Sequence, residues 1–274
     1  MTATTTAQPV DRLTPISLDE LVARASLQTR VDRKYLVPAT AVDALLTDVA
    51  PHVQVLQIGT LRTFAYESVY FDTADLLTYH LAAHRRRRRF KVRTRTYLDS
   101  AQCWLEVKTR GARGATVKNR LPYDPDRAAD LRPGGWYVET VLADAGIHGV
   151  DAGTLHPVLL TRYLRTTLFL PASSSRVTID THLTWDDGEH LVTVPHLAVV
   201  ETKTGSCASP LDRMLWASGA RPVRISKYAT GLAALRPDLP ATRWRRTLRR
   251  HVLPHLDTPT PSTHVTERNG TCHA

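Results

Sequence analysis

The feature that most constrains the fold is an alternation of charged and apolar side chains that recurs on about six strand-like segments. In a β-strand, side chains two positions apart share a face. Charged groups with this spacing are Asp32 and Lys34; Lys91, Arg93 and Arg95; Glu106 and Lys108; Lys118 and Arg120; Arg176 and Asp180; and Glu201 and Lys203. The opposite faces are mostly apolar or β-branched, as at Val92, Val177 and Ile179. A single strand with this alternation is typical of an exposed sheet. Its recurrence on about six segments favours a fold in which the charged faces lie on one common side.

The pattern of elements predicts an α+β fold. Strands are expected over residues 30–37, 63–73, 88–98, 102–110, 115–123, 156–170, 174–185 and 197–205. Helices are expected after a capping box at Ser17 and Glu20, over residues 41–50 and 136–149, and from near Ser226. Many short strands with helices between groups suggest a closed antiparallel β-barrel of about eight strands, with the helices packed outside.

If the apolar faces pack under the helices, the charged faces line the barrel interior. Buried like charges repel one another and lose solvation unless water, acidic groups or a polyanion compensates them. A wet, cationic tunnel is therefore expected. Asp72, in the motif YFDT, is expected to fix a turn rather than to bind a metal ion.

The composition of the 274-residue chain is that of a globular protein, with 42% hydrophobic and 23% charged residues. We expect a flexible N-terminus over residues 1–14, a single tunnel domain over 15–236, and a basic, proline-containing, partly disordered tail over 237–274. No segment has the roughly 20 apolar residues that span a bilayer, and no signal peptide is recognised. Three scattered cysteines support neither disulfides nor a zinc site, so a cytoplasmic location is expected.

The 36 Lys and Arg residues exceed the 26 Asp and Glu residues, which gives a formal net charge of +10. Such an excess favours an anionic partner: a nucleic acid, an acidic membrane surface or a phosphate compound.

A set of motifs in order along the chain resembles one known family. The pieces are RVDRKYLV, SVYFDT, FKVRTRTY, WLEVKTR, TVKNR, LLTRYLRTTL, RVTIDTHL, VVETKTG and RISKYATGL, within about residues 28–236. Together they resemble the VTC domain, the polyphosphate polymerase branch of the CYTH-like triphosphate tunnel metalloenzymes. The resemblance implies an antiparallel tunnel barrel that holds a linear triphosphate.

The resemblance also implies the site residues. Those that would line the tunnel, bind phosphate and act in catalysis are Lys34, Arg93, Arg95, Lys108, Lys118, Arg162, Arg176 and Lys227. Arg224 would bind substrate at one end, although the family usually has Lys there, and Asp32 replaces the family's Glu. Glu201 would hold Mn²⁺ or Mg²⁺, with Glu106 as a weaker candidate and Asp32 or Asp180 assisting.

Metal-dependent phosphoryl transfer, with polyphosphate synthesis from ATP, is the favoured function, and ATP and polyphosphate or triphosphate are the expected partners. One alternative is an inorganic or nucleoside triphosphatase, and another is a non-catalytic module that binds polyphosphate or nucleic acid. The run RRRRRFKVRTR places eight cations in eleven residues, a pattern found in nucleic-acid patches. No aromatic platform accompanies the run, so nucleic acid is the less favoured ligand. The sequence leaves the preferred nucleotide, the oligomeric state and the role of the tail open.

Overall fold

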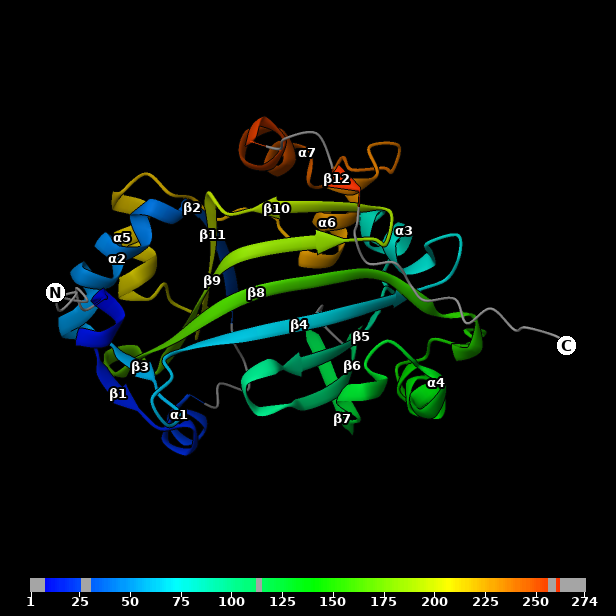
Figure 1. Cartoon of the computed structure of the whole chain (residues 1–274), viewed down its shortest axis with the longest axis horizontal. Helices are drawn as coiled ribbons and strands as arrows, with labels where there is room; N and C mark the ends of the chain where they lie inside the picture. The colour runs from blue at the N-terminus through cyan, green and yellow to red at the C-terminus, as the bar shows by residue number, and fades with distance from the viewer. Residues whose placement is uncertain (1–7, 26–30, 112–114, 256–259, 262–274) are drawn as a thin grey trace, which may run out of the picture.

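The computed structural model describes residues 8–25, 31–111, 115–255 and 260–261, and within these ranges twelve strands form one sheet (Figure 1). Its middle consists of three long neighbouring strands, β4 (Thr63–Asp72), β8 (His156–Leu170) and β9 (Ser175–Asp186). On one side follow β5 (Lys91–Tyr97), β6 (Gln102–Arg110) and β7 (Thr116–Tyr123). On the other side β9 pairs with β11 (Leu197–Thr204), and β11 pairs with β2 (Val31–Pro38).

The remaining strands extend the sheet at its ends. The other end of β9 pairs with β10 (His190–Val194), which pairs with β12 (Thr260–Pro261). β3 (Gln54–Leu56) joins β8 and pairs in parallel with β1 (Thr14–Ile16), whereas the other pairings are antiparallel.

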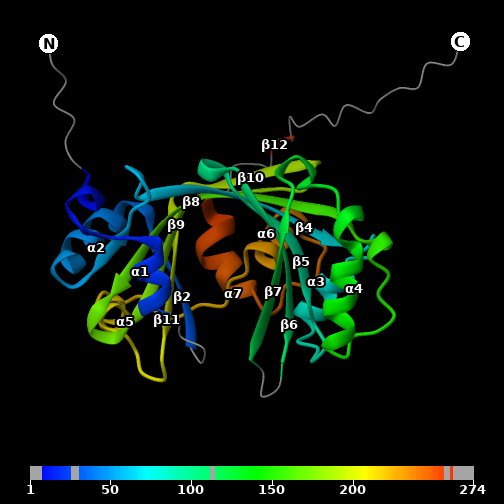
Figure 2. The same cartoon turned by 90° about the horizontal axis from the view of Figure 1, so that it is seen from below.

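The expectation of a closed barrel is wrong. Among the described residues β2 pairs only with β11, and β7 pairs only with β6, so both remain edge strands. Figure 2 shows instead a strongly bent sheet, whose two arms, β2 with β11 and β6 with β7, descend from the long central strands. The alternation of side chains decides which face of a strand is charged, but closure also depends on strand tilt and stagger, about which alternation says nothing.

Two apolar clusters cover the outer face of this sheet. One packs α2 (Val42–Val49) and α5 (Pro210–Ala217) against residues such as Tyr35, Val177 and Val200. The other packs α4 (Gly135–Asp144) against Val92 and Val107. Helices outside the sheet were expected, and their apolar contacts turn the charged side of the strands inward.

The inner face is partly covered by helices as well, which the sequence pattern did not predict. α6 (Lys227–Leu235) and the C-terminal segment containing α7 (Arg245–Thr247) and a π-helical turn (Leu248–Val252) lie between the arms (Figure 2). Their apolar residues join α3 (Leu77–Ala83) and the inner side of the sheet in one cluster that includes Tyr228 and Trp244. Gly231 allows the contact, because a Cβ there would lie 2.4 Å from the Trp185 ring. The short α1 (Leu18–Arg24) begins at the expected Ser17 capping box.

Candidate active site

Three carboxylates, two of them buried and the third partly buried, lie on the inner face of the sheet, each surrounded by cations. The first is Glu106 on β6, whose register places it opposite Arg93 on β5. Arg93 donates to Glu106 Oε2 from Nε at 2.8 Å and from Nη2 at 2.6 Å, and Lys118 donates to Oε1 at 3.0 Å. Arg95 Nη1 lies 3.9 Å from Oε1. Burial opposes ionisation of Glu106, but Arg93 and Arg95 outweigh it and hold the pKa of this carboxyl well below its usual range.

The second carboxylate, Asp180 on β9, is bound by two cations from different elements. Arg165 on β8 forms a fork with it, with Nε to Oδ1 at 2.6 Å and Nη2 to Oδ2 at 2.7 Å, and Lys227 at the start of α6 donates to Oδ2. The Arg165 guanidinium stands over the Tyr66 and Tyr163 rings, 5.1 and 5.2 Å from their centres. Burial raises the pKa of Asp180, but Arg165 and Lys227 prevail and lower it to about 2.

The third carboxylate, Glu201 on β11, lies between two lysines. Lys34 on β2 donates to Oε1 at 2.7 Å, and Lys203 Nζ lies 4.0 Å from Oε2. The two lysines outweigh the effect of burial, so the pKa of Glu201 is well below its usual range. Burial lowers the pKa of Lys203 to about 7, although Glu201 opposes this shift.

Charges of the two arms influence one another across the inner face. Burial lowers the pKa of Lys91 on β5 to about 7, and the cationic neighbours that add to this shift include Arg93 and, from the other arm, Lys34. The Lys91 ammonium donates to Ser226 Oγ at 2.7 Å, next to Lys227. The charge of Arg93 and burial together lower the pKa of Lys108 well below its usual value. The charges on the inner face therefore act on one another, and cations outnumber carboxylates there.

Most of the expected site residues meet on this face. They are Asp32, Lys34, Arg93, Arg95, Glu106, Lys108, Lys118, Arg176, Asp180, Glu201 and Lys227. Arg224 is exposed just before α6, where its carbonyl accepts a hydrogen bond from Thr247 Oγ1 at 3.0 Å. Four further members were not singled out from the sequence as site residues: Lys91, Tyr163, Arg165 and Lys203.

The expectation that Arg162 lines the tunnel is wrong. Arg162 faces the outer side of the sheet, where its Nε donates to Glu67 Oε2 at 2.8 Å. In the motif LLTRYLRTTL the two arginines are three positions apart, so they lie on opposite faces of β8. The structure therefore assigns the inner position to Arg165. The signal that could have identified Arg165 is its pairing with Asp180, which faces inward.

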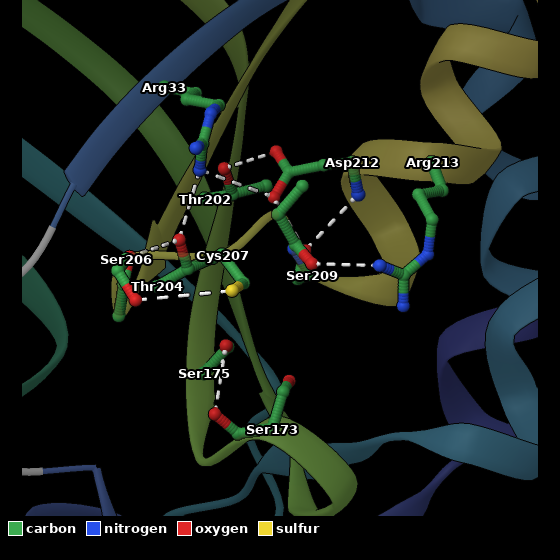
Figure 3. A network of polar contacts seen from close by, with 12 residues as sticks. Arg33, Ser173, Ser175, Thr202, Thr204, Ser206, Cys207, Ser209, Asp212 and Arg213 are labelled. Carbon is green, nitrogen blue, oxygen red and sulfur yellow. Dashed lines mark hydrogen bonds and ion pairs between the residues drawn. The ribbon is translucent and has the colours of Figure 1, made fainter.

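A buried network on the outer side fixes the arm that carries Glu201. Between Glu201 and Lys203, the Thr202 side chain points outward and donates to Asp212 Oδ1 at 2.7 Å, as does the Tyr35 hydroxyl at 2.7 Å. Asp212 Oδ2 accepts from Ser209 N at 2.7 Å and Ser209 Oγ at 2.8 Å, which caps α5. Figure 3 shows the contacts of Asp212 with Thr202 and Ser209. Because Tyr35 follows Lys34 and Thr202 follows Glu201, the network holds both strands of the Lys34–Glu201 pair.

The donor set fits a metal ion that arrives with phosphate. Among the described residues no group of three or more His, Cys, Asp or Glu side chains comes together, and each inner carboxylate is already matched by cations. Mg²⁺ sites commonly use one or two carboxylates together with substrate phosphates. If phosphate oxygens replaced Glu201 as the ion-pair partners of Lys34 and Lys203, the Glu201 carboxylate would be available as such a ligand.

Comparison with known protein families finds the VTC domain over residues 29–236. The chain belongs to the VTC domain family. This confirms the resemblance carried by the ordered motifs. A search of curated proteins finds no match. None of the helices in the described part of the chain is long and apolar enough to cross a membrane.

Among solved structures, the VTC-domain chain is similar to a Hippeastrum protein, HpAC1, which is named for adenylyl cyclase and is described as having a dominant triphosphatase activity. The identity is 20%, the TM-score is 0.48, and the alignment covers 74% of this chain and 94% of the other. A Bacillus halodurans protein named for adenylate cyclase has 14% identity and a TM-score of 0.48, with 72% and 94% covered. A Pyrococcus furiosus protein has 12% identity and a TM-score of 0.41, with 73% and 98% covered.

Proposed function

We propose that this protein catalyses metal-dependent phosphoryl transfer on a linear triphosphate or polyphosphate held on the inner face of the sheet, and that its reaction is polyphosphate synthesis from ATP. One observation carries the proposal: Arg and Lys side chains from β2, β5, β6, β7, β8, β9, β11 and α6 gather on the inner face of the sheet, and Arg93 and Arg165 among them are buried. Membership of the VTC domain family supports triphosphate chemistry and is the reason to prefer synthesis to hydrolysis.

The residues present suit the demands of phosphoryl transfer. The reaction needs the phosphates held in line and their charge neutralised, and little covalent help. Arg93 and Arg165 present planar forks that bind carboxylate now and match phosphate oxygens equally well. Lys34, Lys118 and Lys227 add point charges around them. Fixed cations that already face the site need little reorganisation when charge develops.

In the proposed reaction a terminal oxygen of the growing polyphosphate attacks the γ-phosphorus of ATP. The bond from that phosphorus to the β–γ bridging oxygen breaks, and ADP leaves. Mn²⁺ or Mg²⁺, held by Glu201 and the phosphates, would supply further neutralisation of the charge. The cationic side chains orient both phosphate chains and prevent their mutual repulsion.

The deciding experiment incubates purified protein with ATP and Mn²⁺ and separates long polyphosphate from orthophosphate on a gel. Chains together with ADP are expected. Orthophosphate without chains would show that the protein hydrolyses triphosphate and does not synthesise polyphosphate. Tight, salt-sensitive polyphosphate binding without turnover would reduce the protein to a binding module.

A Glu201→Gln variant tests the assigned metal position. We expect turnover to fall by more than about a hundredfold, because the contribution of a bound metal ion is several kcal/mol. Triphosphate binding without metal should persist, since the surrounding cations remain. Mn²⁺ should strengthen triphosphate binding in the wild type but not in the variant, as measured by calorimetry. Glu189→Gln, at an exposed carboxylate, is the matched control, and an equal metal effect in all three proteins would exclude the role of Glu201.

A further inference from the structure

A second group of cations lies where the α3–β5 connection, the end of β6 and the C-terminal segment meet. Arg85 and Arg89 belong to the connection, Arg110 ends β6, and Arg243 precedes α7. Arg243 donates to the carbonyl of Ala82 on α3 at 3.3 Å, and Arg89 donates to the carbonyl of Arg86 at 2.8 Å. These bonds use backbone acceptors, so the guanidinium charges are oriented but not neutralised.

These four arginines are here called the arginine cluster. Arg85 N and Arg243 Nη1 both donate to the carbonyl of Ala82, each at 3.3 Å. Arg89 and Arg110 lie two residues beyond the paired Lys91 and Lys108, at the same end of β5 and β6. Burial lowers the pKa of both Arg89 and Arg243. The charges of Arg110, Arg243 and Arg85 lower that of Arg89 further, and the charges of Arg224, Arg85 and Arg110 lower that of Arg243 further. Within the described ranges none of the four has a carboxylate within 4 Å. A fold that brings uncompensated cations together from three separate segments leaves room for an anion to stabilise them.

The arginine cluster continues the charge of the inner face. Arg89 is two residues before Lys91, and both Arg89 and Arg243 act on the Lys91 ammonium, as do Arg93 and Lys34. Lys91 therefore lies close to both groups of cations. An anion that extends beyond the inner face past Lys91 would meet the arginine cluster next.

The surroundings favour a phosphate chain over a nucleic acid. The large rings beside the cluster, Tyr79, Phe90 and Trp244, are at most 3% exposed. Single-stranded nucleic acids rely on accessible aromatic rings for base stacking, and buried rings cannot provide it. Arginine side chains can still bind phosphate oxygens through paired hydrogen bonds, which need no base stacking.

We propose that Arg85, Arg89, Arg110 and Arg243 form a second anion-binding site, which takes the phosphates of a linear polyphosphate chain that extend beyond those on the inner face. The assignment rests on the proposed function, because it presumes that the inner face holds one end of such a chain. It gives the protein a preference for long chains over tripolyphosphate.

The test compares the binding of tripolyphosphate and of a long polyphosphate to the full chain by calorimetry. The Arg85→Ala/Arg110→Ala variant removes two exposed side chains, so the fold should persist. Long-chain binding should weaken at least about tenfold, as expected for the loss of charge-assisted contacts, while tripolyphosphate binding changes little. Arg249→Ala/Arg250→Ala removes the same charge from an exposed helical turn outside the cluster and should leave both affinities nearly unchanged. Arg89→Gln/Arg243→Gln should reproduce the long-chain effect.

The outcomes separate the two proposals. If tripolyphosphate does not bind the wild type, the proposed function falls with the second site. If tripolyphosphate binds but long chains gain nothing, or both double-alanine variants weaken long-chain binding equally, the second site alone is refuted. Tighter binding of a single-stranded oligonucleotide than of polyphosphate through the same arginines would also overturn it.

Discussion

At the scale of single residues, strand parity decides what Arg162 and Arg165 do. Arg165 is buried among the inner cations, whereas Arg162 is half-buried on the outer face with Glu67. The two are nearly adjacent and chemically identical, so they form a natural matched pair.

We expect Arg165→Gln to weaken tripolyphosphate binding by at least about tenfold, because it removes a forked contact to phosphate from a site of low solvation. Arg162→Gln should change the affinity by less than about twofold, as for an ordinary surface substitution. Calorimetry at fixed salt measures both, with circular dichroism to verify folding. Equal losses would mean that Arg165 has no special access to the ligand.

The residue-level error has a physical source. The sequence motifs correctly gathered Arg93, Arg95, Lys118 and Glu201 on one face, because alternation is strict within these short strands. β8 is longer, and its register with β9 shifts between Arg162 and Leu164. Family motifs identify the segment but not which of two arginines points inward, so the position of Arg165 required the paired strands.

At the scale of elements, α6 brings Lys227 into the site and is anchored by a buried acid. The Tyr228 hydroxyl donates to Asp72 Oδ2, at the end of β4. Asp72 also accepts from Thr78 N at 2.8 Å and from Tyr79 N at 2.9 Å, which fastens α3. The turn-fixing role expected for Asp72 is confirmed, and it extends to a helix more than 150 residues later in the chain.

Tyr228→Phe should lower the free energy of unfolding by about 1–3 kcal/mol, because it deprives a buried carboxylate of a hydrogen-bond donor. Urea denaturation measures this change. Tyr137→Phe on α4 is the matched control, because no hydrogen bond to the Tyr137 hydroxyl is found within the described part of the chain, and it should be nearly neutral. If both variants unfold at the same urea concentration as the wild type, the Asp72 anchor contributes no stability.

The elements themselves were largely predictable, including α6 from near Ser226, but the placement of helices on the inner face was not. Strands and outer helices follow from local periodicity, as in β5, β6 and α4. The C-terminal segment enters the inner apolar cluster through Trp244, Leu248 and Val252, which are spaced four residues apart within a basic stretch. Because the segment contains many arginines, its apolar stripe at helical spacing was not recognised in the sequence. The stripe is evident from its packing with α3 and α6.

At the scale of the whole molecule, the site belongs to two arms whose outer edges are unpaired within the described residues. Closure could not be predicted, since it depends on how the bent sheet accommodates α6 and α7 between the arms. The two sides nevertheless influence one another, because Lys34 on β2 acts on Lys91 on β5, which pairs with Lys108 of the other arm. A ligand that spans both arms should therefore change the protonation of lysines on each of them.

Triphosphate binding should take up protons near pH 8. Burial lowers the pKa of Lys91 and of Lys203 to about 7 in the free protein, so both are largely neutral at that pH. A bound polyanion favours their charged form and raises their pKa. By linkage, the affinity for triphosphate should fall as the pH rises from about 7 to 9. Calorimetry in two buffers of different ionisation enthalpy gives the proton number, which Lys91→Met and Lys203→Met should each reduce by up to about one. The ionisation of the ligand cancels in these differences, and identical proton numbers in all three proteins would show that neither lysine meets the phosphates.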